Sequence, residues 1–486
     1  MKKSARYLIL ACFSSLFVWG LYRIIIFAAG NAVLPNEIVR IFLFSAFVLL
    51  YPVFKKYQPT FPHIAAIWFL MSLILCWLKN EQYLRFVSTG FDLGIRANIL
   101  YNIIKHGRVW DSLNQAHGFS GHFWPAAFPL ALLLKIWFDP RVLLFSQAVW
   151  LASAVFPLFL IMKNDETPSD FMWLFLVMFL LNHYFHNINS FDFHPESLGT
   201  ALVLWFLYFT ERGSFVIALI LMAAAFTLKE DIPIAFGSLA LYGFFYDKKL
   251  RKFWMTVGGL SLIYFILALV VISNYGSIGE SISTHYAFEP LPFKRLEYAL
   301  KFFASMGFLP LLSPSRTLMF ILPFFEHILS SWKPHFHLSG QYTAMLLPIS
   351  FYVGIRNSKL LSKGHAEALI VAGILISILQ FNVKKYLPDK AQLPLVRYEK
   401  IDSLLSTLPD SMPVAGGNHI TPHIALRDST YQLPLVLNAK LIVVDTTWHD
   451  FYPLDEKRYR SMVDSLLKNG FENISNDLGL MMLKRR

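Results

Sequence analysis

Long apolar stretches follow one another along most of the chain, and they restrict its possible folds more than any other feature. The first stretch, 7–29, comes directly after three basic residues, and comparable stretches recur as far as residue 382. Inside a bilayer every backbone polar group must be hydrogen bonded within the protein, so only helices or closed barrels can span it. Continuous apolar runs of this length favour helices. The sequence therefore predicts an α-helical polytopic membrane protein.

About 13 segments are candidate spans, although some are shorter than the roughly 20 residues that a helix needs to cross hydrocarbon. These segments are 7–29, 38–54, 61–78, 141–162, 171–188, 197–211, 214–228, 232–246, 253–273, 297–312, 317–330, 341–356 and 366–382. The stretch 122–138 contains two prolines and Lys135. We expect it to lie at the interface without crossing.

Basic residues give the spans an orientation, because Lys and Arg concentrate in cytoplasmic loops. When the N-terminus is cytoplasmic and the spans alternate, all the basic clusters fall on the inner side. They lie at 55–56, 163, 212, 248–252, 316 and 356–363. The C-terminal region and most of the histidines then lie outside the cytoplasm, so we expect the polar chemistry of the protein on that side.

The density of charge changes near residue 383. From Lys384 onward there are 14 basic and 12 acidic residues, close to the proportion found in soluble proteins. Residues 441–445 and 479–483 have the pattern of buried strands, and 457–469 has that of a helix. We expect additional N-terminal spans at 1–60, a membrane domain at 61–382 and a small extracytoplasmic α/β domain at 383–486.

Some classes of function are excluded. The sequence has no Walker phosphate-binding loop, no GxSxG nucleophile elbow and no dinucleotide-binding fingerprint. Both cysteines, Cys12 and Cys76, lie within apolar stretches, which excludes a disulfide scaffold and a cysteine-based zinc site. The net charge of +12 comes from scattered basic residues. In a membrane protein this balance indicates loops that face anionic lipid and not a nucleic-acid partner.

The first outer segment contains the sequence Gly90-Phe91-Asp92-Leu93-Gly94. Asp92 could begin a helix that runs to about His106, with its carboxylate accepting hydrogen bonds from the first amides as an N-cap. It could equally be a functional carboxylate just outside the bilayer. The spacing alone leaves both interpretations open.

Asp192, His194 and Glu196 alternate along the turn 189–196. Alternate residues of an extended segment share one face, so these three side chains could together hold a divalent cation such as Mg or Mn, or bind a polar substrate. The alternative is a polar turn in which Glu196 occupies the first turn of the next helix and interacts favourably with its dipole.

Lys229, Glu230 and Asp231 lie in a short turn between two apolar stretches. Charges in this position are costly if they face lipid, so we expect them to face water, a cavity or each other, and a functional role is favoured. The alternative is a solvated turn that ends two helices. His122, at the start of the interfacial stretch, could contact a lipid phosphate or belong to an aromatic belt.

Two further pairs of residues are candidates for binding. Gln341 and Tyr342 come at the outer start of a predicted span, whereas His423 and Arg427 follow a glycine turn in the soluble region. Ligands of open α/β sheets bind beyond the carboxyl ends of the strands. For His423 and Arg427 the alternative interpretation is simple loop capping.

Taken in order, these motifs resemble a family of bacterial integral-membrane proteins known as a domain of unknown function and grouped with the C-type glycosyltransferase superfamily. The resemblance covers about residues 80–486. It is carried by the ordered set of motifs, each of which is weak alone. The set comprises Phe91-Asp92-Leu93-Gly94-Ile95, His122 with Pro125, Asp192-Phe193-His194-Pro195-Glu196, Lys229-Glu230-Asp231, Gln341-Tyr342, and Pro422-His423 with Arg427.

The resemblance implies a multi-pass enzyme of the bacterial inner membrane that takes a sugar from a polyprenyl-phosphate or polyprenyl-diphosphate donor on the extracytoplasmic side. Asp92 matches the essential acidic residue of the first outer loop, as a general base or a metal-site carboxylate, and Glu230 and Asp231 would complete the catalytic site. The substrate would be bound by His122, Lys229, Gln341, Tyr342, His423 and Arg427. The cation, if one is used, would be held by Asp192, His194 and Glu196.

Two other functions fit the same sequence. In a transporter or lipid flippase, Lys229, Glu230 and Asp231 would line a pathway through the membrane. In a non-catalytic scaffold, the soluble region would be the binding module. The sugar, the acceptor, the lipid and the oligomeric state are not indicated by the sequence.

Overall fold

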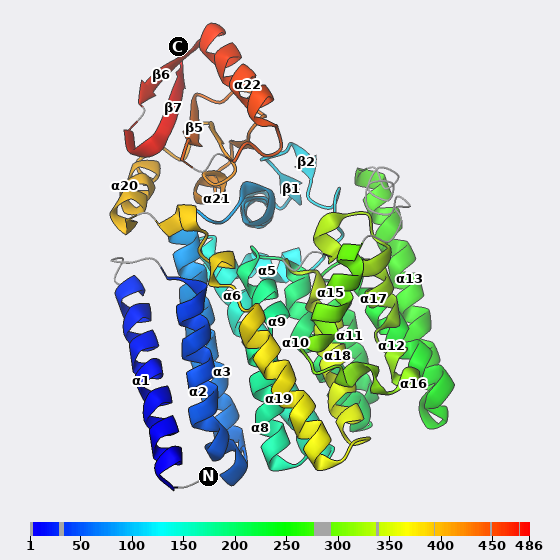
Figure 1. Cartoon of the computed structure of the whole chain (residues 1–486). Helices are drawn as coiled ribbons and strands as arrows, with labels where there is room; N and C mark the ends of the chain where they lie inside the picture. Colours follow the sequence, from blue (N-terminus) through cyan, green and yellow to red (C-terminus); the bar gives the residue numbers. More distant parts are fainter. Residues whose placement is uncertain are drawn as a thin grey trace.

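The computed structural model describes residues 3–28, 34–276, 293–336, 340–392, 394–447, 450–475 and 477–486. Helices packed side by side form a block, and a sheet with its own helices covers one end of that block (Figure 1). Helix α1 begins at the opposite end, so the first helix starts far from the sheet that ends the chain. Most of the predicted outer loop 274–296 lies outside the described residues.

The longest helices match predicted spans. They are α1 (Lys3–Ala28), α2 (Asn36–Lys56), α3 (Phe61–Leu84), α13 (Arg251–Tyr275) and α19 (Lys363–Gln380), together with the consecutive pair α6 (Arg141–Ala152) and α7 (Val155–Asn164). Six segments of the described chain are long and apolar enough to cross a membrane. A seventh is obtained if α8 (Ser169–Leu181) and α9 (His183–Ser190), which bend by 41°, count as one span.

Other predicted spans form shorter helices, so the count of about 13 stays a prediction. The segment 317–330 contains only the four-residue α16 (Pro314–Thr317) in part and the nine-residue α17 (Ile321–Leu329). At about 1.5 Å per residue, neither reaches across hydrocarbon alone. The remaining short helices of the block are α4 (Ile95–His106), α5 (Ala127–Ile136), α10 (Gly199–Glu211), α11 (Phe215–Phe226), α12 (Ile232–Tyr246), α15 (Phe293–Ala304) and α18 (Leu346–Ser358).

Ion pairs gather the loops that the sequence places in the cytoplasm. Lys55 and Lys363 both pair with Asp170, at 3.3 and 3.1 Å. Arg356 pairs with both Asp165 and Glu211. These residues come from the ends of α2, α7, α10 and α18 and from the starts of α8 and α19, so those helix ends share one end of the block. The loops therefore cluster as the positive-inside argument requires, while the orientation in the membrane stays a prediction.

The C-terminal sheet has five strands in the order β4-β3-β5-β7-β6. Strands β3 (Val414–Gly416), β4 (Thr430–Gln432) and β5 (Leu441–Asp445) are parallel, whereas β7 (Leu480–Arg485) is antiparallel to β5 and to β6 (Phe471–Ser475). The helices α20 (Leu395–Ser406), α21 (Thr421–Ile424) and α22 (Glu456–Lys468) accompany them. The strands expected at 441–445 and 479–483 and the helix expected at 457–469 are present within about a residue or two, while the division of the chain at residues 60 and 382 stays a prediction.

The sheet is anchored to the segment that follows α3. The Gly90 amide donates to both the backbone carbonyl (2.6 Å) and the side-chain oxygen (3.0 Å) of Asn418. The Gln432 amide donates to the carbonyl of Leu113, and Asn98 donates to the carbonyl of Ala425. Leu113 follows the small hairpin strand β1 (Trp110–Asp111), whose partner is β2 (Ala116–His117). The C-terminal region thus fixes the backbone next to Asp92.

Replacement of Gly90 by alanine should loosen this anchor. The added Cβ would lie 1.8 Å from the Gln432 side-chain oxygen and 2.9 Å from the Thr421 Cβ, so the sheet must shift. Overpacking of this kind typically costs about 1–3 kcal/mol. We expect a lower thermal unfolding temperature and faster proteolysis of the C-terminal region. Gly121→Ala is the control, because its Cβ meets nothing within 4 Å; equal stability of the two variants would contradict the anchor.

Candidate active site

A cavity of about 920 Å³ lies where the predicted motifs meet. One wall is polar and is formed by the segments around Asp92, His122, His194 and Lys229, with Gln341 and Tyr342. The other wall is mainly apolar and comes from α12, α13 and α17, with Glu326 of α17 as its acidic member. Its apolar side chains include Ile234, Phe265, Leu269, Leu322, Phe325 and Leu329. The cavity can therefore hold a ligand that has one polar and one apolar part.

Asp92 lies within a π-helical turn, Gly90–Gly94, and regular α-helix begins only at Ile95. The N-cap interpretation is therefore wrong: the Asp92 carboxylate accepts from the Thr89 hydroxyl at 3.1 Å and not from the helix amides. Its other oxygen lies 3.3 Å from Nε2 of His194. Burial raises the pKa of Asp92 above its ordinary value, and the neighbouring His194 counteracts this only in part.

Asp192 contacts Asp92 indirectly, through Thr89. Its carboxylate accepts hydrogen bonds from the Thr89 amide at 2.7 Å and from the Thr89 hydroxyl at 3.0 Å. Asp192 is absent from the described lining of the cavity. The Thr89 hydroxyl lies within hydrogen-bond distance of both aspartates and shares its single proton between them, while the Thr89 amide binds Asp192 alone.

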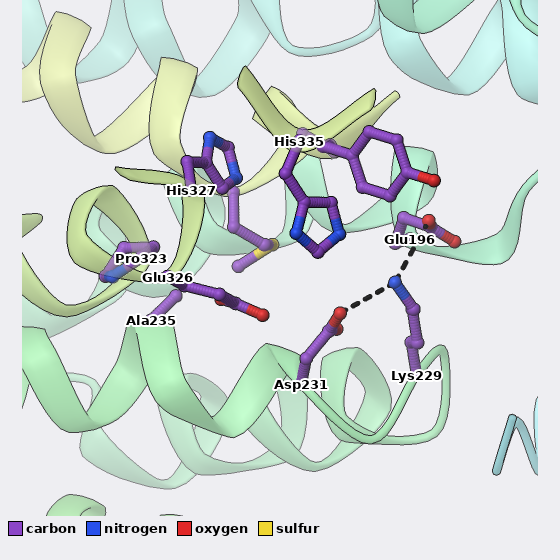
Figure 2. A pocket seen from close by; sticks show the side chains of 11 residues that line it. Glu196, Lys229, Asp231, Ala235, Pro323, Glu326, His327 and His335 are labelled. Atoms are coloured by element: carbon purple, nitrogen blue, oxygen red, sulfur yellow. Dashed lines mark ion pairs between the residues drawn. The ribbon is translucent and has the colours of Figure 1, made fainter. Parts of the chain in front are cut away.

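Lys229 holds two carboxylates at once. Its ammonium lies 2.7 Å from Asp231 and 3.5 Å from Glu196, and Figure 2 shows it between them. Burial works against the charge of Glu196, yet Lys229 lowers the pKa of that carboxyl well below its ordinary value. Burial also opposes the charge of Lys229, but Asp231 and Glu196 raise the pKa of the ammonium. Asp231 is only partly buried, and burial raises the pKa of its carboxyl above the ordinary value although the Lys229 ammonium opposes this. Lys229 and Glu196 therefore form the buried ion pair, and Asp231 joins it from the cavity.

Glu230, in the same turn as Lys229, contacts the residues that precede α5. Its carboxylate lies 2.7 Å from Nδ1 of His122 and accepts the Phe123 amide at 3.0 Å. Burial opposes ionisation of Glu230, but His122 lowers the pKa of this carboxyl below its ordinary value. The two acids of the Lys229-Glu230-Asp231 turn thus have different partners, which separates their roles.

The predicted cation site is not assembled. After His194 the chain enters a 3-10 turn (Pro195–Leu198), so the alternating face expected for an extended strand is lost. Asp192 turns to Thr89, His194 to Asp92 and Glu196 to Lys229. Among the residues that the structure describes, no three His, Cys, Asp or Glu side chains form a group that could hold a metal ion. These donors do not fit a preformed Mg or Mn site, and we derive no step through a cation.

His423 and Arg427 lie outside the cavity, contrary to the expected role in substrate binding. His423 stacks on Phe86, with ring centroids 3.7 Å apart, and its Nδ1 lies 3.0 Å from Asp402. Arg427 donates to the carbonyls of Leu408 and Pro409. Both side chains are used to hold the C-terminal region together, because the loop after β3 turns toward α20 and α3. These contacts are the ones that the loop-capping interpretation expects, and a role of either residue in substrate binding stays a prediction.

Three residues of the cavity were missed by the sequence argument. Glu326 falls in the predicted span 317–330, and His335 falls in the loop between that span and the next, to which no role was given. Figure 2 shows Glu326 and Asp231 extending toward each other beside His335. An ionisable residue within an apolar stretch is itself a signal of function, which would have identified Glu326. Arg96, which directly follows the Asp92 motif, also lines the cavity.

The fold is that of the C-type glycosyltransferases. The chain is similar to the crystal structure of ArnT from Cupriavidus metallidurans bound to undecaprenyl phosphate, with a TM-score of 0.58 and 12% identity over 86% of this chain and 97% of that one. The apo crystal structure of the same protein gives a TM-score of 0.54 and 12% identity, over 86% and 98% of the two chains.

The fold is thus that of a multi-helix membrane protein similar to ArnT. The chain belongs to the family of predicted membrane proteins DUF2079, which it matches over residues 82–474. The comparison with curated proteins gives no significant match. The family resemblance expected from the ordered motifs is therefore confirmed.

Removal of Lys229 should be far more damaging than removal of an exposed lysine. Lys229→Met leaves Glu196 buried without its cation, and breaking a buried pair from one side typically costs about 3–5 kcal/mol. Lys363→Met is the matched control, because this exposed lysine pairs with Asp170 near water, where such pairs contribute at most about 1 kcal/mol. Thermal unfolding in detergent should separate the variants clearly; similar unfolding temperatures would contradict the buried ion pair.

Proposed function

We propose that this protein is a glycosyltransferase of the bacterial inner membrane. It transfers a sugar from a polyprenyl-phosphate-linked donor to an acceptor on the extracytoplasmic side. The N-terminus lies in the cytoplasm, and the sheet region lies outside it. The observation that carries the proposal is the convergence of Asp92, Glu196 and Glu230, distant in sequence, on one cavity that also has an apolar wall.

The two walls suit the two parts of such a donor. A polyprenyl chain is apolar and would lie along α12, α13 and α17, whereas the sugar and phosphate need hydrogen-bonding partners on the polar wall. The likeness to ArnT, whose crystal structure holds undecaprenyl phosphate, supports this class of lipid. Gln341 is buried and Tyr342 lies with its ring 5.8 Å from the Lys229 ammonium, so both would contact the polar part.

Asp92 is the general base of the proposed reaction. It accepts the proton of the acceptor hydroxyl as the acceptor oxygen forms a bond to the anomeric carbon. The bond from that carbon to the phosphate oxygen breaks, and its electron pair leaves with the polyprenyl phosphate. A base must be positioned and must hold a pKa closer to the working pH than a free carboxylate does. Thr89 and His194 fix the position, and burial raises the pKa.

Asp92→Asn should abolish most of the transfer, because the amide cannot accept the proton. Loss of a general base typically lowers the rate by about 100-fold to 10,000-fold. The measurement is transfer of labelled sugar from polyprenyl-phosphate sugar in proteoliposomes. Asp428→Asn is the control, since Asp428 is exposed and pairs with His106 away from the cavity.

Unchanged turnover in Asp92→Asn would remove Asp92 from catalysis. Flux of the sugar-linked lipid across the bilayer without any covalent product would instead identify the protein as a transporter or flippase. The same preparation therefore discriminates between the two functions.

The rate should fall on the acid side of the pH profile. Asp92 acts as a base only when ionised, so activity is lost as the pH drops through its folded pKa, which burial raises above 3.8. His194 favours the ionised form of Asp92, so His194→Gln should move this acid limb to higher pH. A limb that stays in place or moves to lower pH in His194→Gln would contradict the role of His194. The Asp428→Asn profile should match that of the wild type.

A further inference from the structure

Arg96 follows Asp92 by four residues and faces the same cavity from the start of α4. The residue is only 9% exposed. Its guanidinium lies 4.9 Å from the ring centroid of Trp124, and the Trp124 indole donates to the Gly118 carbonyl at 3.2 Å. The indole therefore provides a fixed surface for the planar guanidinium, whose N–H groups remain available in its plane.

The other cations of the cavity are already used. Lys229 is paired with Glu196 and Asp231, and His122 is paired with Glu230. Arg96, in contrast, forms no ion pair and no hydrogen bond with any residue in the described part of the chain. His122 and Lys229 were predicted to bind the substrate, but in the structure each of them already has a carboxylate partner.

Burial disfavours the charge of the Arg96 guanidinium, and its N–H groups have no protein acceptor among the described residues. The carboxylates of Asp92, Asp111, Glu196 and Glu230 act on it only over a longer distance and do not bind its N–H groups. The cost is relieved when a ligand supplies acceptor oxygens. Arginine matches phosphate best, because two of its parallel N–H groups can reach two oxygens of one phosphate.

We propose that Arg96 binds the phosphate group of the lipid-linked donor, an inference that rests on the proposed function. Asp92 and Arg96 both line the cavity, so one donor bound there can present its phosphate to Arg96 and its anomeric carbon to the acceptor beside Asp92. When the bond from that carbon to the phosphate oxygen breaks, the electron pair stays on the phosphate, and Arg96 stabilises the added charge without transferring a proton.

Binding to the full-length protein in nanodiscs tests this assignment without requiring turnover. The probes are a polyprenyl phosphate, the polyprenol of the same chain length, and inorganic phosphate as a competitor. We expect the wild type to prefer the phosphorylated lipid by about tenfold or more, as a charge-assisted bidentate contact allows. Arg96→Gln should reduce this preference to about twofold or less and leave polyprenol binding unchanged, and Arg96→Lys should be intermediate.

Arg141→Gln is the matched control. Arg141 also lies over aromatic rings, those of Tyr83 and Trp137, but it is paired with Asp139 and is not part of the described cavity lining. The preference for phosphorylated lipid should be retained in this variant. If Arg96→Gln keeps the preference for phosphorylated lipid, the proposal is overturned. It is also overturned if the variant loses affinity equally for polyprenyl phosphate and for polyprenol, because that result indicates a structural role.

Competition with inorganic phosphate shows whether Arg96 binds the phosphate of a lipid headgroup or free phosphate. Displacement of polyprenyl phosphate only at large excess supports a lipid headgroup site, whereas displacement at equal concentration overturns it in favour of a site for free phosphate. Failure of the proposed function gives a different result. A protein that transfers no sugar but still loses its preference in Arg96→Gln would not be a transferase, and the phosphate site would stand.

Discussion

The structure depends on how ionised groups are neutralised next to a membrane. Lys229 and Glu196 form a buried ion pair in which each needs the charge of the other, and Asp231 pairs with Lys229 from the cavity side. The buried pair joins the turn between α11 and α12 to the segment before α10. Because Glu230 in the same turn pairs with His122, the start of α5 is drawn to the same cavity. Electrostatic pairing thus assembles a site from segments that are more than 100 residues apart.

Much of this arrangement follows from the sequence. Apolar stretches predict the long helices because hydrocarbon leaves the backbone no other partners. Short charged motifs between them predict a shared polar site, since charges avoid lipid. The structure brings the motifs around Asp92, His122, His194, Lys229 and Tyr342 to one cavity. The buried strand Leu441–Asp445 was also evident, because four successive aliphatic residues precede an aspartate.

The rest could not be obtained from spacing. Short and broken helices share burial with their neighbours, so hydropathy alone does not decide which segments cross, as at 317–330. Which charged groups form ion pairs depends on the tertiary structure. The sequence alone therefore cannot show that Lys229 is paired with a carboxylate, whereas Arg96 lies over Trp124. The contact between Gly90 and Asn418 joins residues 328 positions apart, and through it the C-terminal sheet orients the turn that carries Asp92. A local pattern contains no trace of such a contact.

The central claim is that a lipid-linked sugar occupies the cavity with its reactive carbon beside Asp92. The most direct measurement is an electron cryo-microscopy structure of the full-length protein with a polyprenyl-phosphate sugar bound. The account predicts lipid density along α12, α13 and α17, phosphate density at the guanidinium of Arg96, and the sugar within hydrogen-bond reach of the Asp92 carboxylate. Density for the headgroup at the opposite end of the helical block, near Asp170, would contradict it.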